Sequence, residues 1–195
     1  TDYRDYDATA SDLYGQHILG NGQIAPGWPV VGLPISRSGF FELPEIVLVA
    51  DGQGGAVITW YDYRVGATSD IYAQRVDKNG VSLWARNGLA VCVASGSQES
   101  PQITIDSRWL SGNQQMQSPE QSGTANEMKG IIIAWEDSRT SGTTGKDIYA
   151  QAINEDAEEF KETLGLDPRW GAVATNKVVC NAANDQTEVQ VAMDG

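Results

Sequence analysis

The 195-residue sequence has few basic residues, a single histidine, two cysteines and no long apolar run. Its 13 Lys and Arg stand against 26 Asp and Glu, which gives a formal net charge of −13. This balance argues against nucleic acid and anionic membrane surfaces as partners, because both need basic patches. No apolar stretch reaches about 18 residues, so we expect no membrane insertion.

The residues that most often carry catalysis or bind zinc are scarce. His17 is the only histidine, and the chain has neither a Gly-x-Ser-x-Gly motif nor a Cys-x-x-Cys pair. Cys92 and Cys180 occupy equivalent positions of an internal repeat, where their Cα atoms should lie farther apart than the roughly 7 Å that a disulfide allows. We expect both cysteines to be free and buried, and we expect no enzyme activity.

An internal repeat is the most informative feature of the chain. A strand signature Asp-x-Tyr-x-Gln occurs three times, and a tag Asp-x-Arg precedes each copy. The signature residues are Asp12, Tyr14, Gln16, Asp70, Tyr72, Gln74, Asp147, Tyr149 and Gln151. The tag residues are Asp2, Arg4, Asp62, Arg64, Asp137 and Arg139. Asp51 and Asp106, which close another repeated strand, are 55 residues apart, a period typical of repeat architectures.

Each repeat predicts four short strands, because runs rich in Val, Ile, Tyr and Trp alternate with turn residues. In the second repeat these strands are 46–50, 56–60, 70–76 and 84–92. The third repeat has counterparts at 102–105, 131–135, 147–153 and 170–180. The first repeat has only its last two strands, which end at residues 18 and 35. Residues 190–193 match the first strand of the repeat once more.

The run 131–135 is apolar at every position, which indicates a sheet buried on both faces. Four-stranded antiparallel sheets of this kind, repeated along the chain, are the blades of a β-propeller. We therefore predict an all-β fold, a β-propeller segment of about two and three-quarter blades. A β-sandwich is the alternative all-β fold, but it does not account for the repeat.

The Trp-x-Asp-x-Arg junctions at 60–64 and 135–139, followed by Asp-Ile-Tyr-Ala-Gln, resemble a known group of sequences. They are similar to the propeller repeats of bacterial secreted and cell-surface proteins, and residues 54–84 match that pattern almost throughout. The resemblance implies an extracellular location and a scaffolding or binding role. It implies no catalytic residues.

The repeat divides one predicted domain into four parts. These are a partial blade at 1–43, a complete blade at 44–97, a complete blade at 98–185 with insertions at about 107–128 and 154–167, and the first strand of a further blade at 186–195. Closed propellers have about four to eight blades, so we expect other blades or other protein chains to cover the end sheets. The uncovered side chains would be Leu13, Tyr14 and Ile18 at one end and Ile148, Tyr149 and Ile153 at the other.

The repeated motif residues are expected to be structural. Each tag Asp should accept backbone N–H groups, and each tag Arg should pair with a nearby carboxylate such as Asp70 or Asp147; a ring of ligand-binding Arg residues is the alternative. The signature Gln should bridge to the backbone of the neighbouring blade. Trp28, Trp84 and Trp170 should pack between blades, with sugar stacking as the alternative.

The two insertions are the least repetitive part of the chain. Trp109, Leu110 and Phe160 are candidate partner-contact residues, since long loops in compact folds are often functional. We expect no cofactor, and the alternative is a weakly held calcium ion on Glu155, Asp156, Glu158 and Glu159.

These features together predict a non-catalytic extracellular module, a structural or protein-interaction scaffold of a larger exported or cell-surface protein or assembly. A glycan-binding propeller module is the first alternative, in which exposed tryptophans would line a groove. A propeller-type glycan-active enzyme is the second, in which carboxylates would converge on a central pocket.

Overall fold

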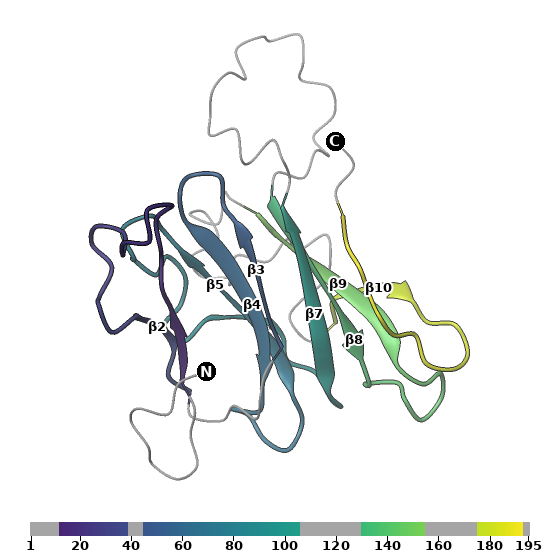
Figure 1. Ribbon diagram of the computed structural model, residues 1–195. Coiled ribbons are helices and arrows are strands. Elements are labelled where there is room, and N and C mark those ends of the chain that lie inside the picture. The colour runs from purple at the N-terminus through teal and green to yellow at the C-terminus, as the bar shows by residue number, and fades with distance from the viewer. Residues whose placement is uncertain (1–11, 39–44, 106–129, 155–174, 193–195) are drawn as a thin grey trace, which may run out of the picture.

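The computed structural model describes residues 12–38, 45–105, 130–154 and 175–192, and these residues are all-β (Figure 1). Their strands form a two-stranded antiparallel sheet and two four-stranded antiparallel sheets with the strands in chain order. The strands are β1 (Leu13–Gly15), β2 (Leu33–Ser36), β3 (Ile46–Ala50), β4 (Ala56–Asp62), β5 (Asp70–Val76), β6 (Leu89–Cys92), β7 (Gln98–Ile105), β8 (Gly130–Asp137), β9 (Asp147–Asn154) and β10 (Lys177–Cys180). No helix in this part of the chain could cross a membrane.

The three sheets pack against one another through alternating side chains of the central β3–β6 sheet. Ile58 and Trp60 of β4 lie in one buried cluster with Leu13 and Ile35 of the first sheet. Val57, on the opposite face of β4, lies in a second cluster that includes side chains of the β7–β10 sheet. The central sheet is therefore covered on both faces, as predicted from the apolar strands.

The two four-stranded sheets repeat the same register around the motif. Trp60 pairs with Tyr72 across β4 and β5, and Trp135 pairs with Tyr149 across β8 and β9. The signature strands β5 and β9 are the third strands of their sheets, as predicted. The described structure thus confirms an all-β fold with antiparallel four-stranded sheets.

Some strand boundaries differ from the prediction. Trp28 and Trp84 lie in the connections before β2 and β6, because a turn through Gly32 (φ +86°) and Gly88 (φ +99°) separates them from the strand. Strand β7 begins four residues earlier than expected, at Gln98. The further strand predicted over 190–193 is wrong for 190–192, which are not in a strand; 193 lies outside the described residues.

The side chains expected to be exposed at the end sheets are mostly buried. Leu13 is 3% exposed, Ile148 8%, Tyr149 6% and Ile153 1%. The prediction was wrong because Leu13, Tyr149 and Ile153 face the central sheet and pack in the clusters that it forms with its neighbours. Tyr14 is half-buried and Ile18 is 54% exposed, so only Ile18 clearly behaves as predicted.

The tight turn between β3 and β4 depends on Gly55, where a Cβ atom would lie 2.1 Å from the backbone oxygen of Val76. We expect Gly55→Ala to lower the free energy of unfolding by about 2 kcal/mol or more, because a backbone atom cannot yield to it. Gly66→Ala is the matched control, since nothing lies within 4 Å of the Cβ position there. Denaturant unfolding of both variants measures the difference, and equal stabilities would contradict the tight approach at Gly55.

Candidate functional site

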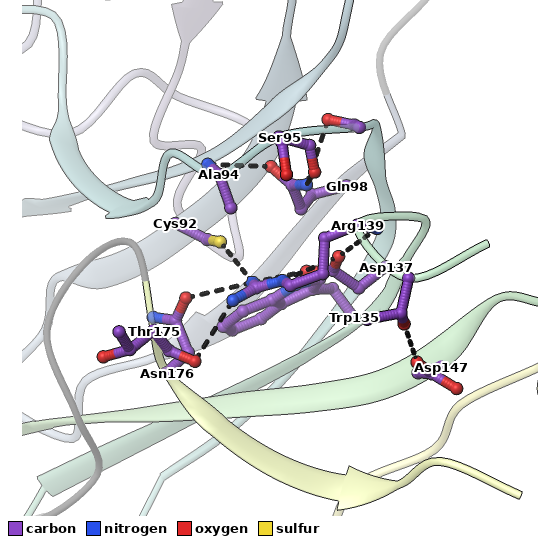
Figure 2. A network of polar contacts seen from close by, with 12 residues as sticks. Cys92, Ala94, Ser95, Gln98, Trp135, Asp137, Arg139, Asp147, Thr175 and Asn176 are labelled. Atoms are coloured by element: carbon purple, nitrogen blue, oxygen red, sulfur yellow. Dashed lines mark hydrogen bonds and ion pairs between the residues drawn. The ribbon is translucent and has the colours of Figure 1, made fainter. Parts of the chain in front are cut away.

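The two Asp-x-Arg tags that the structure describes each hold a buried carboxylate at the end of the second strand of their sheet. Asp137 is fully buried and accepts hydrogen bonds from Trp135 Nε1 at 2.8 Å, from Arg139 Nε at 2.9 Å and from the backbone N–H of Arg139 at 2.9 Å (Figure 2). The Asp62 carboxylate has the same three donors at 2.9, 2.9 and 3.1 Å, from Trp60 and Arg64. A buried carboxylate requires such donors, because burial removes its water.

The tag arginines lie over the signature tyrosines. The Cζ atom of Arg64 is 3.6 Å from the ring centre of Tyr72, and that of Arg139 is 4.0 Å from that of Tyr149. Burial raises the pKa of Tyr72 to about 12, so its hydroxyl stays protonated. Each network therefore combines an ion pair with a cation–π contact.

The tag Arg pairs with a nearby carboxylate, as predicted, but the carboxylates given as examples were wrong. Arg64 and Arg139 pair with the Asp of their own tag, not with Asp70 or Asp147. With one residue between them, Asp and Arg form a two-point ion pair within the turn, and the next strand is not needed. The expected backbone acceptance by the tag Asp is confirmed.

The tag Arg also joins its sheet to the preceding one. Arg64 Nη2 donates to Ser36 Oγ at 3.3 Å, at the end of β2. Arg139 Nη2 donates to Cys92 Sγ at 3.0 Å, at the end of β6 (Figure 2). Ser36 and Cys92 are equivalent, since each ends the fourth strand of its unit after the same register shift.

The two cysteines are free, as predicted, but only Cys92 is fully buried. Burial raises the pKa of the Cys92 thiol to about 12, against the lowering effect of Arg139. Cys180 is half-buried, which corrects the prediction. It ends β10, whose neighbouring residue Val179 is 61% exposed, so this edge lacks the cover that β6 has.

Gln16 and Gln74, two of the three signature glutamines, fix the connection before the fourth strand of their own unit. Gln74 Oε1 accepts the backbone N–H of Trp84 at 2.9 Å, and its Nε2 donates to the Ala85 oxygen at 2.9 Å. Gln16 donates to the Pro29 oxygen at 2.8 Å in the same way. The predicted bridge to a neighbouring blade was therefore wrong, because this connection folds back over the Gln side chain of its own unit.

The structure also reveals polar residues for which the sequence carries no repeat signal. Asn176 donates to the Val91 oxygen at 3.0 Å and to Gln151 Oε1 at 3.1 Å, so it links two sheets. Lys146 Nζ lies 3.0 Å from Glu99 and 3.1 Å from Glu136. The equivalent residues of the second unit are Gly88 and Ser69, so neither side chain recurs, which is why the repeat did not identify them.

The two described tryptophans of this set pack between sheets, as predicted. Trp28 donates through Nε1 to the Lys78 oxygen at 2.9 Å and lies against Gly80, which confirms packing between sheets. Trp84 is half-buried and packs against the buried cluster between the second and third sheets, and it also lines a groove between β2 and the connection from β5 to β6. Trp170 lies outside the described residues.

That groove has a cavity volume of about 380 Å³ and crosses from the first sheet to the second. Its lining residues include two arginines and no carboxylate. The complete lining is Pro34, Ile35, Ser36, Arg37, Gln74, Ser82, Trp84, Arg86 and Asn87. Its volume is that of a small-ligand site, and its lining is mostly polar.

Several predicted site residues lie outside the described part of the chain. These are Asp2, Arg4, Trp109, Leu110, Glu155, Asp156, Glu158, Glu159 and Phe160. Within the part that the structure describes, no three His, Cys, Asp or Glu side chains form a group that could hold a metal ion. His17 makes an edge contact with Trp28, with ring centres 5.6 Å apart.

Comparison of the chain with protein-family models, curated proteins and solved structures finds no match. The resemblance to exported propeller repeats therefore stays a prediction from the motifs.

We expect Arg139→Ala to lower the free energy of unfolding by about 1–3 kcal/mol, because it leaves Asp137 buried without its cation. Arg86→Ala, at an exposed arginine, is the control and should change stability by less than about 0.5 kcal/mol. Denaturant unfolding measures both. An Arg139→Ala protein as stable as the control would show that the network is dispensable.

Asp70 should make stability depend on pH. Burial and the nearby Asp62 charge raise the pKa of Asp70 from 3.8 to about 6. The folded state then holds this proton more tightly than the unfolded state, so the carboxyl contributes stability at low pH that is lost as pH rises through about 6. Asp70→Asn should therefore stabilise the protein by about 1–3 kcal/mol near neutral pH and by nothing near pH 4. A gain that does not change with pH would refute this assignment.

Proposed function

We propose that this chain is a run of β-propeller blades that serves as a non-catalytic interaction scaffold in an exported or cell-surface protein or assembly. The propeller arrangement is supported by three sheets that pack face to face and by the identical register of their motif strands. The location outside the cell comes from the sequence resemblance alone. The structural role of the repeated Asp and Arg residues is supported by their mutual pairing within each sheet.

One observation carries the proposed interaction role. Ile35, Val91 and Val179 occupy the same position, the residue at the register shift of the fourth strand. Ile35 is 4% and Val91 0% exposed, because each packs in a cluster shared with the following sheet. Val179 is 61% exposed. The β10 edge thus presents a surface that elsewhere in this chain receives another unit.

The position of Cys180 also supports the docking of another unit at the β10 edge. It corresponds to Ser36 and Cys92, which accept hydrogen bonds from the tag Arg of the following sheet. A unit of the same repeat would bring such an Arg to Cys180 and an apolar face to Val179. We therefore propose that the partner of this edge is a further unit of this kind, from the same polypeptide or from another chain.

The test uses copies of this chain as partners for one another. Sedimentation velocity should show association that grows with protein concentration, and alkylation of Cys180 should slow in parallel. Cys92, fully buried with a raised pKa, should react only after unfolding. Val179→Glu should abolish association, whereas Val65→Glu, at a position with 63% exposure in a loop of the central sheet, should not.

A sharp monomer at every concentration, with a constant rate of Cys180 alkylation, would overturn the proposed docking of another unit. Association that survives Val179→Glu would place the contact elsewhere on the molecule.

Glycan binding is a second candidate function, and the position of Trp84 favours it. Trp84 packs against a buried cluster but is only half-buried, and it lines a groove beside polar side chains, so part of this residue is open to a sugar ring.

A further inference from the structure

The groove between β2 and the β5–β6 connection is built from residues that the repeat does not require. The connection Trp84-Ala85-Arg86-Asn87-Gly88 corresponds to 28–32 in the first unit, since Gly32 and Gly88 have the same positive φ. Val30 and Val31 stand there in place of Arg86 and Asn87. Arg86 is therefore specific to this groove, whereas Asn87 also serves the turn, because its φ of +66° is a left-handed conformation that asparagine adopts more readily than valine.

The groove is held in shape by contacts from both sheets. Gln74 fixes the backbone at Trp84 and Ala85. Asn87 Oδ1 accepts the backbone N–H of Arg37 at 3.1 Å, and the Asn87 backbone oxygen accepts Arg64 Nη1 at 2.9 Å. The first sheet and the connection are thus tied together, so the groove is preformed.

The charge of the groove is opposite to that of the molecule. The chain has a formal net charge of −13, yet the lining contains Arg37 and Arg86 and no carboxylate. Arg86 is exposed and makes no ion pair with the described residues. Arg37 is 50% exposed and is oriented by Tyr14, whose hydroxyl accepts its Nη2 at 3.0 Å, with Asp12 3.9 Å away. An anionic ligand would supply Arg86 with the partner that it lacks.

We propose that this groove binds an acidic saccharide, a glycan that carries uronic-acid carboxylates. The part of Trp84 that core packing leaves open offers apolar surface to a sugar ring. Arg86, together with Arg37, which also pairs with Asp12 at 3.9 Å, offers donors to a carboxylate, and Ser82 and Asn87 offer polar groups to hydroxyls. The volume of about 380 Å³ lies within the range of roughly 300–1,000 Å³ of small-ligand sites. The proposal rests on the second candidate function and gives its ligand class.

The test is calorimetric titration with a galacturonic acid trisaccharide and with its methyl ester, which keeps the sugar and removes the charge. We expect the acid to bind at least about tenfold more tightly than the ester, and its affinity to fall as salt is added. Arg86→Val, which introduces the residue of the first unit, should reduce the affinity for the acid about tenfold or more and leave that for the ester unchanged. Lys177→Ala, at an exposed cation on β10, is the matched control and should change neither.

Melting curves of each variant show that it is folded. If acid and ester bind equally, or if Arg86→Val binds the acid as wild type does, the acidic ligand class is wrong while glycan binding stands. If neither saccharide binds, both are wrong. The scaffold proposal depends on the opposite end of the described structure, at β10, and is untouched by either result.

Discussion

The buried carboxylate of the Asp-x-Arg tag is the constraint on which the rest of the structure depends. Asp62 and Asp137 are fully removed from water, so each needs a cation and several donors at once. The guanidinium that neutralises the carboxylate also covers a tyrosine ring and reaches the preceding sheet. One electrostatic requirement thereby fixes the turn within a sheet, the position of the next strand and the contact between sheets.

The aromatic residues around this network leave little freedom elsewhere. Trp60 donates to Asp62, and its ring then occupies the space beside Gly88, where a Cβ atom would approach it to 2.6 Å. Residue 88, in the turn before β6, must therefore be glycine for two reasons. Its φ is +99°, and the Trp60 indole leaves no room for a Cβ atom. In the same way, Gln74 holds the connection that presents Trp84 to the groove. The scaffold and the candidate ligand site share these supports.

The sequence was sufficient to predict what is local and repeated. Strands β4, β5, β8 and β9 followed from apolar runs and from the signature, whose period-two alternation leaves no ambiguity about their faces. The acceptor of each tag Arg could not be predicted, because Ser36 lies 28 residues from Arg64 and Cys92 lies 47 residues from Arg139. The groove could not be predicted from the sequence either, since Arg37 and Arg86 come together only through sheet packing. The prediction that Leu13 and Tyr149 are exposed failed for a related reason. Alternation shows that the two faces of a strand differ, but not which face meets the neighbouring sheet.

The contact between sheets has a consequence for how such units can be exchanged. The donor belongs to one unit and the acceptor to the unit before it, and the acceptor is a hydroxyl in Ser36 and a thiol in Cys92. Because a guanidinium accommodates either, recombination at the boundary between two units does not have to preserve a specific residue pair. The number and order of units can therefore change during evolution while each new junction keeps a donor and an acceptor.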